Sequence, residues 1–291
     1  MVYAVALGSA VLYGAADFTG GLATRRAGAI PVVLLSQASG LVLLALILPF
    51  LPHASPSRPD LLWGASAGVT GGIGVALLYR ALAIGTMAVV APTTAVCAVA
   101  IPVVVSVFLG ERPVPLALAG IALGIVSIVL VSQQQTTTAP ERHDPAASKP
   151  PRARPAGLGT ALASGVAIGF FFLSLAQTGS NAGAWPLIVA RLVSVTLFGA
   201  VAIAGGRSLR MPARVTALAI GGGMVDMLAN ALYMLAAREG PLSIVVTLSS
   251  LYPASTVLLA RVVLGERLSR SQISGVACAL AAVVLIVSGG R

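Results

Sequence analysis

Three charged side chains interrupt long apolar runs of this sequence: Asp17, Arg191 and Asp226. If these runs cross a membrane, a charge near the centre of one costs at least about 2.5 kcal/mol, so each charge needs a structural or functional reason. A guanidinium can hold a carboxylate through two parallel hydrogen bonds. Arg191 is therefore a candidate ligand for a substrate carboxylate. The structural alternatives are an ion pair with an aspartate and extension of its side chain to the membrane surface.

Asp226 belongs to a polar stripe in the segment GGGMVDMLANALY. Asn230 follows it by four residues and Tyr233 by seven, and residues at these spacings share one face of a helix. We expect this face to bind substrate, with Asp226 holding an ammonium group or a coupled proton. An interhelical hydrogen bond or salt bridge that stabilises the bundle is the alternative.

Asp17 lies near the end of its apolar run, one helical turn after Tyr13. It is the second candidate for proton coupling. Alternatively, it lies at the level of the lipid headgroups, beside Arg25 and Arg26.

Four further side chains are candidate substrate contacts: Gln37, Tyr79, Ser249 and Tyr252. An interfacial aromatic or an interhelical hydrogen bond is the alternative for Tyr79 and Gln37. Ser249 and Tyr252 precede Pro253, the proline of the ninth apolar run, whereas Pro92 and Pro102 interrupt the fourth. An interior proline removes a backbone hydrogen bond and kinks a helix, so these three are candidate hinges; a static bend is the alternative.

The composition determines which elements must position these residues. Hydrophobic residues make up 57% of the 291 residues and charged ones only 9%, whereas a soluble domain carries about 25% charged residues. The apolar runs are continuous and about 20 residues long, which is the length of a membrane-spanning helix. They lack the alternation typical of a membrane β-barrel. The sequence therefore predicts an all-α integral membrane protein.

Ten spans are expected, and one hydrophilic segment divides them. Residues 133–156 contain Pro, Gln, Thr and charges but no large apolar side chain, which predicts a disordered linker. Residues 1–132 and 157–291 then form two five-helix units. The predicted spans are 2–22, 30–50, 61–82, 86–108, 114–132, 157–177, 185–204, 214–236, 241–263 and 271–289.

The two units match at a constant offset of 155 residues, which indicates a duplication. The offset relates Gly14 to Gly169, Gly28 to Gly183, Pro31 to Pro186, Gly85 to Gly240, and the LGER of residues 109–112 to that of 264–267. Because five is odd, the second unit must cross the membrane in the opposite orientation. Inverted repeats of this kind are typical of secondary transporters, whose substrate site lies between the repeats.

The ends of both units also resemble a known family. The segments PVVVSVFLGERPVPLALAGIALGIVSIVLV and YPASTVLLARVVLGERLSRSQISGVACALAAVVLIV combine a proline-containing helix, an LGER exit and a glycine-rich helix. They resemble the EamA-type domain of the drug/metabolite transporter superfamily. The resemblance implies a ten-helix basket around a central cavity, export of small metabolites, often amino acids, and cytoplasmic termini.

The LGER pairs are not expected to be catalytic. Each glycine can end a helix and each arginine favours a helix C-terminus. We expect the glutamate to bond the following turn or to pair locally. Glycines at Gly64, Gly68 and Gly72, and at Gly120 and Gly124, have the spacing of close helix packing within a monomer; a dimer face on the fifth and tenth spans is the alternative.

The charge pattern predicts a membrane orientation and argues against a nucleic-acid-binding protein. The net charge is +10, but the basic residues lie in short connections, so no nucleic-acid partner is expected. Thirteen basic residues fall on the side of the linker, and four fall on the other: Arg58, Arg112, Arg238 and Arg291. The positive-inside rule then places the linker in the cytoplasm and both termini outside, the reverse of what the resemblance implies.

Metal and enzyme chemistry find little support in the sequence. His53 and His143 lie in a loop and in the linker, and no cysteine or histidine motif of a metal site occurs. Cys97 and Cys278 fall in apolar runs and are expected to be free thiols. No cofactor is expected, and the eight acidic residues are too scattered for a membrane enzyme.

We therefore expect a transporter of a bacterial-type cytoplasmic membrane. It would export small metabolites, with amino acids as the expected class, by alternating access between the two units. The driving force would be a substrate, proton or ion gradient, because no ATP-binding motif is present. A passive facilitator or channel and an exporter of cationic drugs are the alternatives.

Overall fold

The computed structural model describes residues 2–108, 110, 114–132, 156–206, 208–239, 245 and 248–289. Helices joined by short turns form this part of the chain, and it contains no strand, which confirms the all-α prediction. Two single 3-10 turns occur, at Leu48–Phe50 and Ser180–Ala182. The α-helices are α1 Val2–Ala27, α2 Ala29–Ile47, α3 Arg58–Ile84, α4 Met87–Phe108, α5 Pro115–Ser132, α6 Leu158–Ala176, α7 Trp185–Ala204, α8 Ala213–Glu239, α10 Tyr252–Leu264 and α11 Arg270–Gly289.

Eight segments in the described part of the chain are long and apolar enough to cross a membrane. They lie in α1 to α4, α6 to α8 and α11. Two further apolar helices are shorter, at Pro115–Leu130 and Tyr252–Leu264. The linker predicted at residues 133–156 lies outside the described residues except for Ala156.

The ninth predicted span, residues 241–263, is not one helix. Ser250 and Leu251 form a turn, and α10 begins at Tyr252 with Pro253 in its first turn. The interpretation of Pro253 as an interior proline was therefore wrong. A proline has no N–H to donate and fixes its own φ, so it fits the first turn of a helix better than the interior. By contrast, Pro92 and Pro102 lie inside α4, which continues across both.

The helices pack in matched pairs that reflect the 155-residue offset. At this offset, α1 corresponds to α6, α2 to α7, α3 to α8 and α5 to α11. The α1–α8 contact has its counterpart in α6–α3, and the α2–α8 contact in α7–α3. The pairs α2–α7 and α5–α11 each join an element to its own counterpart. This pattern is that of two units related by a pseudo-two-fold axis.

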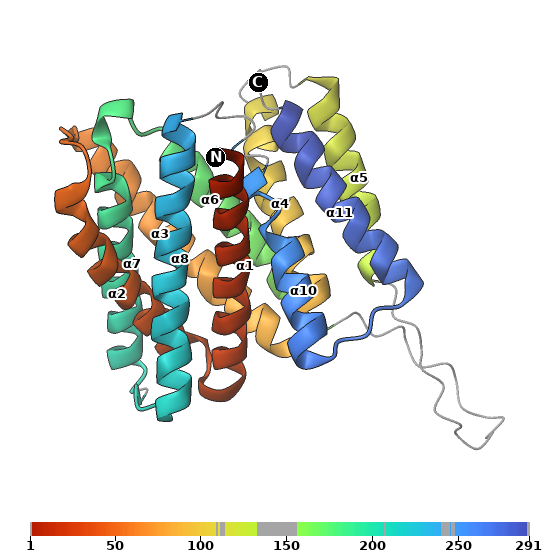
Figure 1. Ribbon diagram of the computed structural model, residues 1–291, viewed down its shortest axis with the longest axis horizontal. Coiled ribbons are helices and arrows are strands. Elements are labelled where there is room, and N and C mark those ends of the chain that lie inside the picture. Colours follow the sequence, from red (N-terminus) through yellow and green to blue (C-terminus); the bar gives the residue numbers. More distant parts are fainter. Residues whose placement is uncertain are drawn as a thin grey trace.

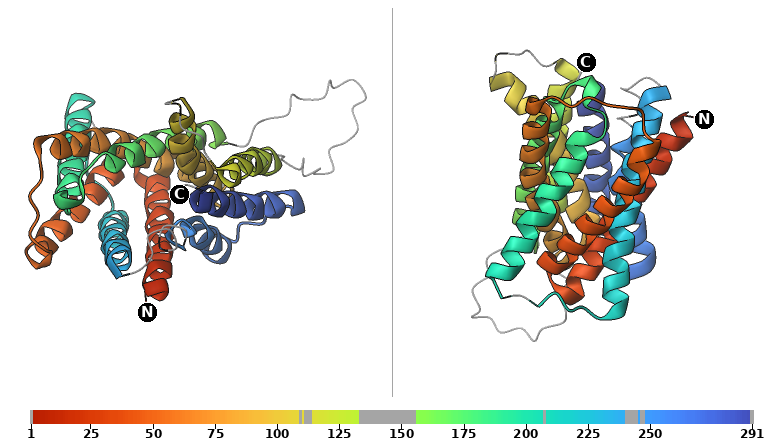
Figure 2. Two further views of the ribbon diagram at one scale, coloured as in Figure 1. Left: turned by 90° about the horizontal axis from the view of Figure 1, so that it is seen from above. Right: turned by 90° about the vertical axis from the view of Figure 1, so that its left-hand side faces the viewer.

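The direction of the helices follows from the residues in contact. On α1 and α3, Gly20 meets Tyr79 and Gly21 meets Leu82, so these two helices run parallel. α6 runs antiparallel to α3, because its Ser164 bonds Gly74 whereas its Ser174 bonds Ser66. α6 is thus inverted relative to α1, and α1 begins at the end of the bundle where α11 finishes (Figures 1 and 2).

Glycines on α3 bring it against the backbone of α7. A Cβ added at Gly64 would lie 2.7 Å from the Pro186 carbonyl oxygen, and one at Gly68 would lie 2.5 Å from that of Ala190. Gly120 of α5 meets Ile286 of α11 in the same way. The predicted close packing within the monomer is confirmed at these glycines.

Candidate functional site

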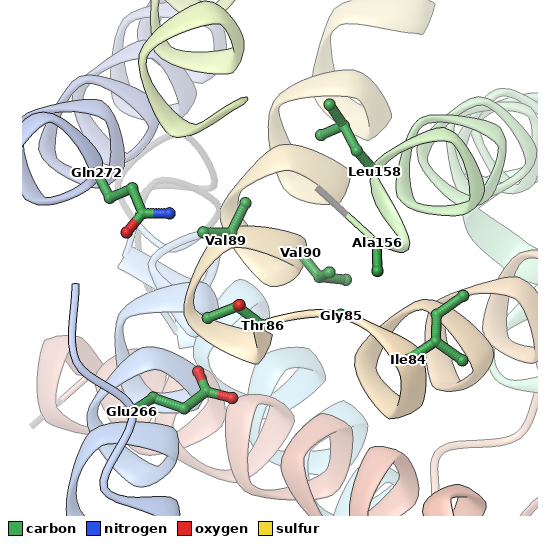
Figure 3. Close-up of a pocket in the computed structure, with 9 residues that line it drawn as sticks. All are labelled: Ile84, Gly85, Thr86, Val89, Val90, Ala156, Leu158, Glu266 and Gln272. Carbon is green, nitrogen blue, oxygen red and sulfur yellow. The ribbon is translucent and has the colours of Figure 1, made fainter. Parts of the chain in front are cut away.

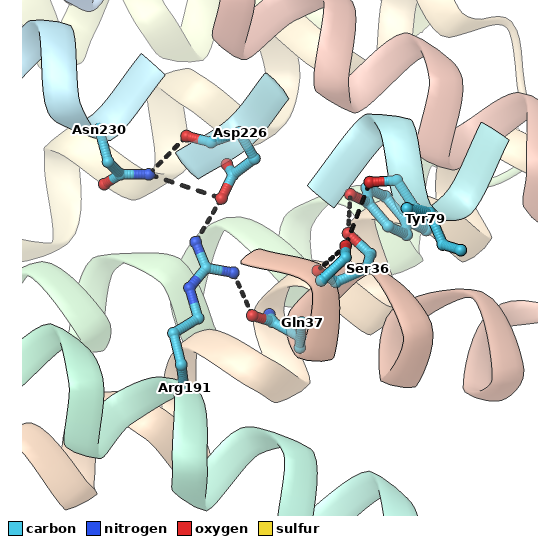
Figure 4. Close-up of polar contacts among 8 residues, drawn as sticks. Ser36, Gln37, Tyr79, Arg191, Asp226 and Asn230 are labelled. Carbon is cyan, nitrogen blue, oxygen red and sulfur yellow. Dashed lines mark hydrogen bonds and ion pairs between the residues drawn. The ribbon is translucent and has the colours of Figure 1, made fainter. Parts of the chain in front are cut away.

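Arg191 extends from α7 toward α2 and α8 and contacts two side chains at once (Figure 4). One terminal nitrogen, Nη2, forms an ion pair with Asp226 Oδ2, and the other, Nη1, donates to Gln37 Oε1. Asp226 lies in the middle of α8, and its side chain is 24% exposed, against 13% for Arg191. The two charges neutralise each other in a half-buried position within the helix bundle. Of the sequence-based alternatives for Arg191, the structure shows the ion pair with an aspartate.

Asn230 supports the carboxylate from the next turn of α8. Its Nδ2 donates to the Asp226 carbonyl oxygen at 2.8 Å and lies 3.5 Å from Asp226 Oδ2. Tyr233, the third member of the predicted stripe, packs against an apolar cluster that contains Ala6, Ala236 and Val245. The stripe therefore contributes its first two residues to the ion-pair site.

Close approach of α2 and α8 lets Gln37 and Asp226 reach the same guanidinium. A Cβ added at Gly223 would lie 2.1 Å from the Ser36 carbonyl oxygen, and one at Gly40 would lie 3.1 Å from that of Gly223. Ser39 donates across the same contact to the Ile220 carbonyl oxygen at 3.1 Å. Larger side chains at the two glycines would push the helices apart and move Gln37 away from Asp226, so that Arg191 could no longer contact both.

Tyr79 lies next to this site but is enclosed. Its hydroxyl is 3.5 Å from that of Ser36, the neighbour of Gln37 on α2, and its ring covers Gly20. Only 3% of Tyr79 is exposed. It shapes the wall behind the polar site and is closed to substrate in this conformation.

A second polar group lies where α1 meets α10. The rings of Tyr13 and Tyr252 make an edge-to-face contact with centroids 6.4 Å apart. Asp17, one turn further along α1, is within electrostatic range of Asp226 and Tyr252. It forms no ion pair within the described part of the chain. All three side chains of this group are half-buried.

Ser249 is not part of either group. Its hydroxyl donates to the Ala6 carbonyl oxygen at 3.4 Å, and only 6% of the residue is exposed. It therefore links the segment before α10 to α1.

The prediction for the LGER glutamate was wrong in its second copy. Gly265 ends α10 with a positive φ of 65°, as expected, but Glu266 bonds neither the following turn nor a local partner. Its carboxylate accepts the backbone N–H groups of Met87 and Ala88 at the start of α4. Sequence reasoning missed this contact because its partners lie almost 180 residues away. In the first copy, Gly110 has a positive φ of 88°, and the rest lies outside the described residues.

Two cavities lie at opposite ends of the bundle. A cavity of about 90 Å³ contacts Asn230 and is otherwise apolar; it lies where α2 ends and α7 begins. A larger one, of about 300 Å³, is lined by Gly85, Thr86, Glu266 and Gln272 among others (Figure 3).

No three His, Cys, Asp or Glu side chains cluster as metal ligands in the part of the chain that the structure describes. Cys97 and Cys278 are free thiols.

Fold and site together define a multi-pass helical membrane protein with charged residues paired inside the bundle. The model of the EamA-like transporter family matches residues 1–133 and 148–288, in two repeats that cover most of the chain. The chain belongs to this family, whose members are transporters and not enzymes. A search among curated proteins found no match.

Proposed function

We propose that this protein is a secondary transporter that exports small metabolites, with amino acids as the expected substrate class. The ion pair between Arg191 and Asp226 carries the proposal. In the proposed topology, ten spans form two inverted repeats in a bacterial cytoplasmic membrane, and the site lies near the midplane. Alternating access of the two repeats then exposes it to each side in turn.

A zwitterion fits this pair because it can replace both partners. When Arg191 turns from Asp226 to the substrate carboxylate, Asp226 becomes free for the substrate ammonium group. Each buried charge keeps a partner, so the several kcal/mol that an unpaired buried charge costs are avoided. Gln37 remains as an acceptor for Arg191, and Asn230 remains bonded to the Asp226 carbonyl oxygen and within 3.5 Å of its carboxylate.

Export of cationic compounds is the second candidate function, and a different observation favours it. Asp17 has no ion pair within the described residues, so two carboxylates and one guanidinium share this interior. The surplus negative charge suits a cation or a coupled proton. Tyr13, one turn before Asp17 on α1, packs against Tyr252, and aromatic rings can attract cations. The break before α10 is also typical of transporter binding sites.

Uptake into proteoliposomes distinguishes the two candidates. Radiolabelled zwitterionic, acidic and basic amino acids would be compared with a lipophilic cation, tetraphenylphosphonium. The proposal predicts saturable uptake of zwitterionic amino acids that Arg191→Gln abolishes. Uptake of tetraphenylphosphonium alone, insensitive to Arg191→Gln, would favour the second candidate and contradict the first.

A further inference from the structure

Glu266 caps a helix of the other repeat. The carboxylate accepts the N–H of Met87 at 3.1 Å and that of Ala88 at 3.0 Å. The first N–H groups of a helix have no partner within it and form its positive end. A side chain just before the helix usually satisfies them, but here the acceptor comes from the segment between α10 and α11. The left-handed turn at Gly265 lets the chain present Glu266 to α4.

Arg25, near the end of α1, completes this contact. Its Nη2 lies 3.5 Å from Glu266 Oε1 and donates to the carbonyl oxygens of Leu82 at 3.3 Å and Gly85 at 3.4 Å. We call Arg25, Glu266 and the N–H groups of Met87 and Ala88 the clasp. It joins α1, the end of α3 and the start of α4, all in the first repeat, to the second repeat.

Glu266 of the clasp and Asn230 of the ion-pair site line cavities at opposite ends of the bundle. The clasp lies at the end where α1 and α3 finish, beside the cavity of about 300 Å³ that Glu266 lines. The cavity that touches Asn230 lies at the other end, against Leu44, Leu187 and Met234. In this conformation the clasp therefore joins the two repeats at one end of the bundle. The cavity that Asn230 of the ion-pair site lines is at the opposite end.

We propose that the clasp is the gate of this end, and that Glu266 is the positioning residue that holds it shut during the transport cycle. The inference rests on the proposed carrier function, because only a carrier must open its two ends in turn. Opening this end requires Glu266 to leave the start of α4, which exposes the α4 surface at Val90. The second LGER motif is then part of the transport mechanism as well as the end of a helix.

The test measures access to each end without any substrate, so it does not depend on which compound is carried. In a chain with Cys97→Ala and Cys278→Ala, a single thiol is placed at Val90, which is 1% exposed on the clasp-side cavity. A second chain carries it at Met234, on the opposite cavity. The rate of labelling by a hydrophilic maleimide is measured in lipid nanodiscs, with and without Glu266→Gln.

We expect Glu266→Gln to accelerate labelling at Val90→Cys about tenfold or more, because two hydrogen bonds to a charged group are weakened. Labelling at Met234→Cys should fall, because the ends open alternately. Glu239→Gln, which removes an exposed carboxylate at the other end of the bundle, should change neither rate. Unchanged labelling at Val90→Cys would overturn the proposal, and so would a rise at both positions, which indicates general loosening.

Arg25→Gln keeps the proposal testable if Glu266→Gln fails to fold. It removes the cation and its contacts with Glu266, Leu82 and Gly85, and it leaves the bonds from Met87 and Ala88 to Glu266 in place. The same reciprocal change is expected with a smaller amplitude. Any other pattern in a folded Arg25→Gln protein would contradict a gate at this position. Failure here would leave the proposed function standing, because uptake of amino acids tests that separately.

Discussion

At the scale of single residues, Arg191 and Asp226 form a structural ion pair, and we propose that the same pair has a functional role. Each neutralises the other in the bundle, so single substitutions cannot separate the two roles. Asp226→Asn leaves the guanidinium unpaired and should cost roughly 1–3 kcal/mol, less than for a fully buried pair because Asp226 keeps 24% exposure. The melting temperature in detergent measures this loss.

The matched variant is the double substitution Arg191→Gln with Asp226→Asn. It removes both charges together, so most of the lost stability should return. Transport should stay abolished, because neither end of a zwitterion finds its partner. A double variant that carried amino acids normally would show that the pair is structural only.

Of the two candidate carboxylates, we propose Asp17 for proton coupling. Asp226 already has Arg191 as its partner, whereas Asp17 forms no ion pair within the described residues. If Asp17 carries the proton, Asp17→Asn should make uptake independent of pH. The pH dependence of uptake in Asp17→Asn is compared with that in Asp226→Asn, which removes the other carboxylate. Proteoliposomes loaded at different internal pH values measure this, and an unaltered pH dependence in Asp17→Asn would exclude the role.

At the scale of elements, the glycines of α3 set its distance from α7 and so the position of Arg191. At Gly68, a Cβ would lie 2.5 Å from the Ala190 carbonyl oxygen, one residue before Arg191. Gly68→Leu should destabilise the protein by about 1–3 kcal/mol through overpacking and reduce transport. Gly199→Ala on α7 is the control, because nothing lies within 4 Å of its added Cβ. Thermal unfolding of both variants checks this; equal melting temperatures would contradict it.

Single elements also show what the sequence could and could not predict. Asp226 and Asn230 were predictable as neighbours on one helix face, and an ion pair of Arg191 with an aspartate was among the alternatives, because polar side chains in apolar runs need partners. The start of α10 at Tyr252 was not, because hydropathy measures the length of an apolar run and is insensitive to a turn within it. The partners of Glu266 also escaped prediction, since they depend on how the two repeats pack.

At the scale of the whole molecule, the 155-residue offset predicts the duplication, whereas the prediction of five spans in each unit comes from the lengths of the apolar runs. The matched helix contacts then follow from the duplication. Membrane orientation does not follow from the duplication, because the two repeats are geometrically interchangeable. The described basic residues at the end where α1 finishes include Arg25, Arg26, Arg267 and Arg270, and we propose that this end is cytoplasmic.

A reporter fused to the C-terminus tests this orientation. The charge distribution predicts that a reporter active only in the cytoplasm stays inactive there, whereas the family resemblance implies the opposite. A fusion at Gly206, between α7 and α8, should give the complementary signal. Cytoplasmic activity at the C-terminus would reverse the proposed orientation without affecting the site.

We propose that this protein is a carrier whose internal ion pair exchanges for a zwitterion. Counterflow tests it most directly, in proteoliposomes loaded with an unlabelled amino acid and given the same labelled compound outside. A carrier predicts that internal substrate accelerates labelled uptake, and that the Arg191→Gln and Asp226→Asn double variant loses this while remaining folded. Uptake that rises linearly with concentration and ignores internal substrate would indicate a channel and contradict the claim.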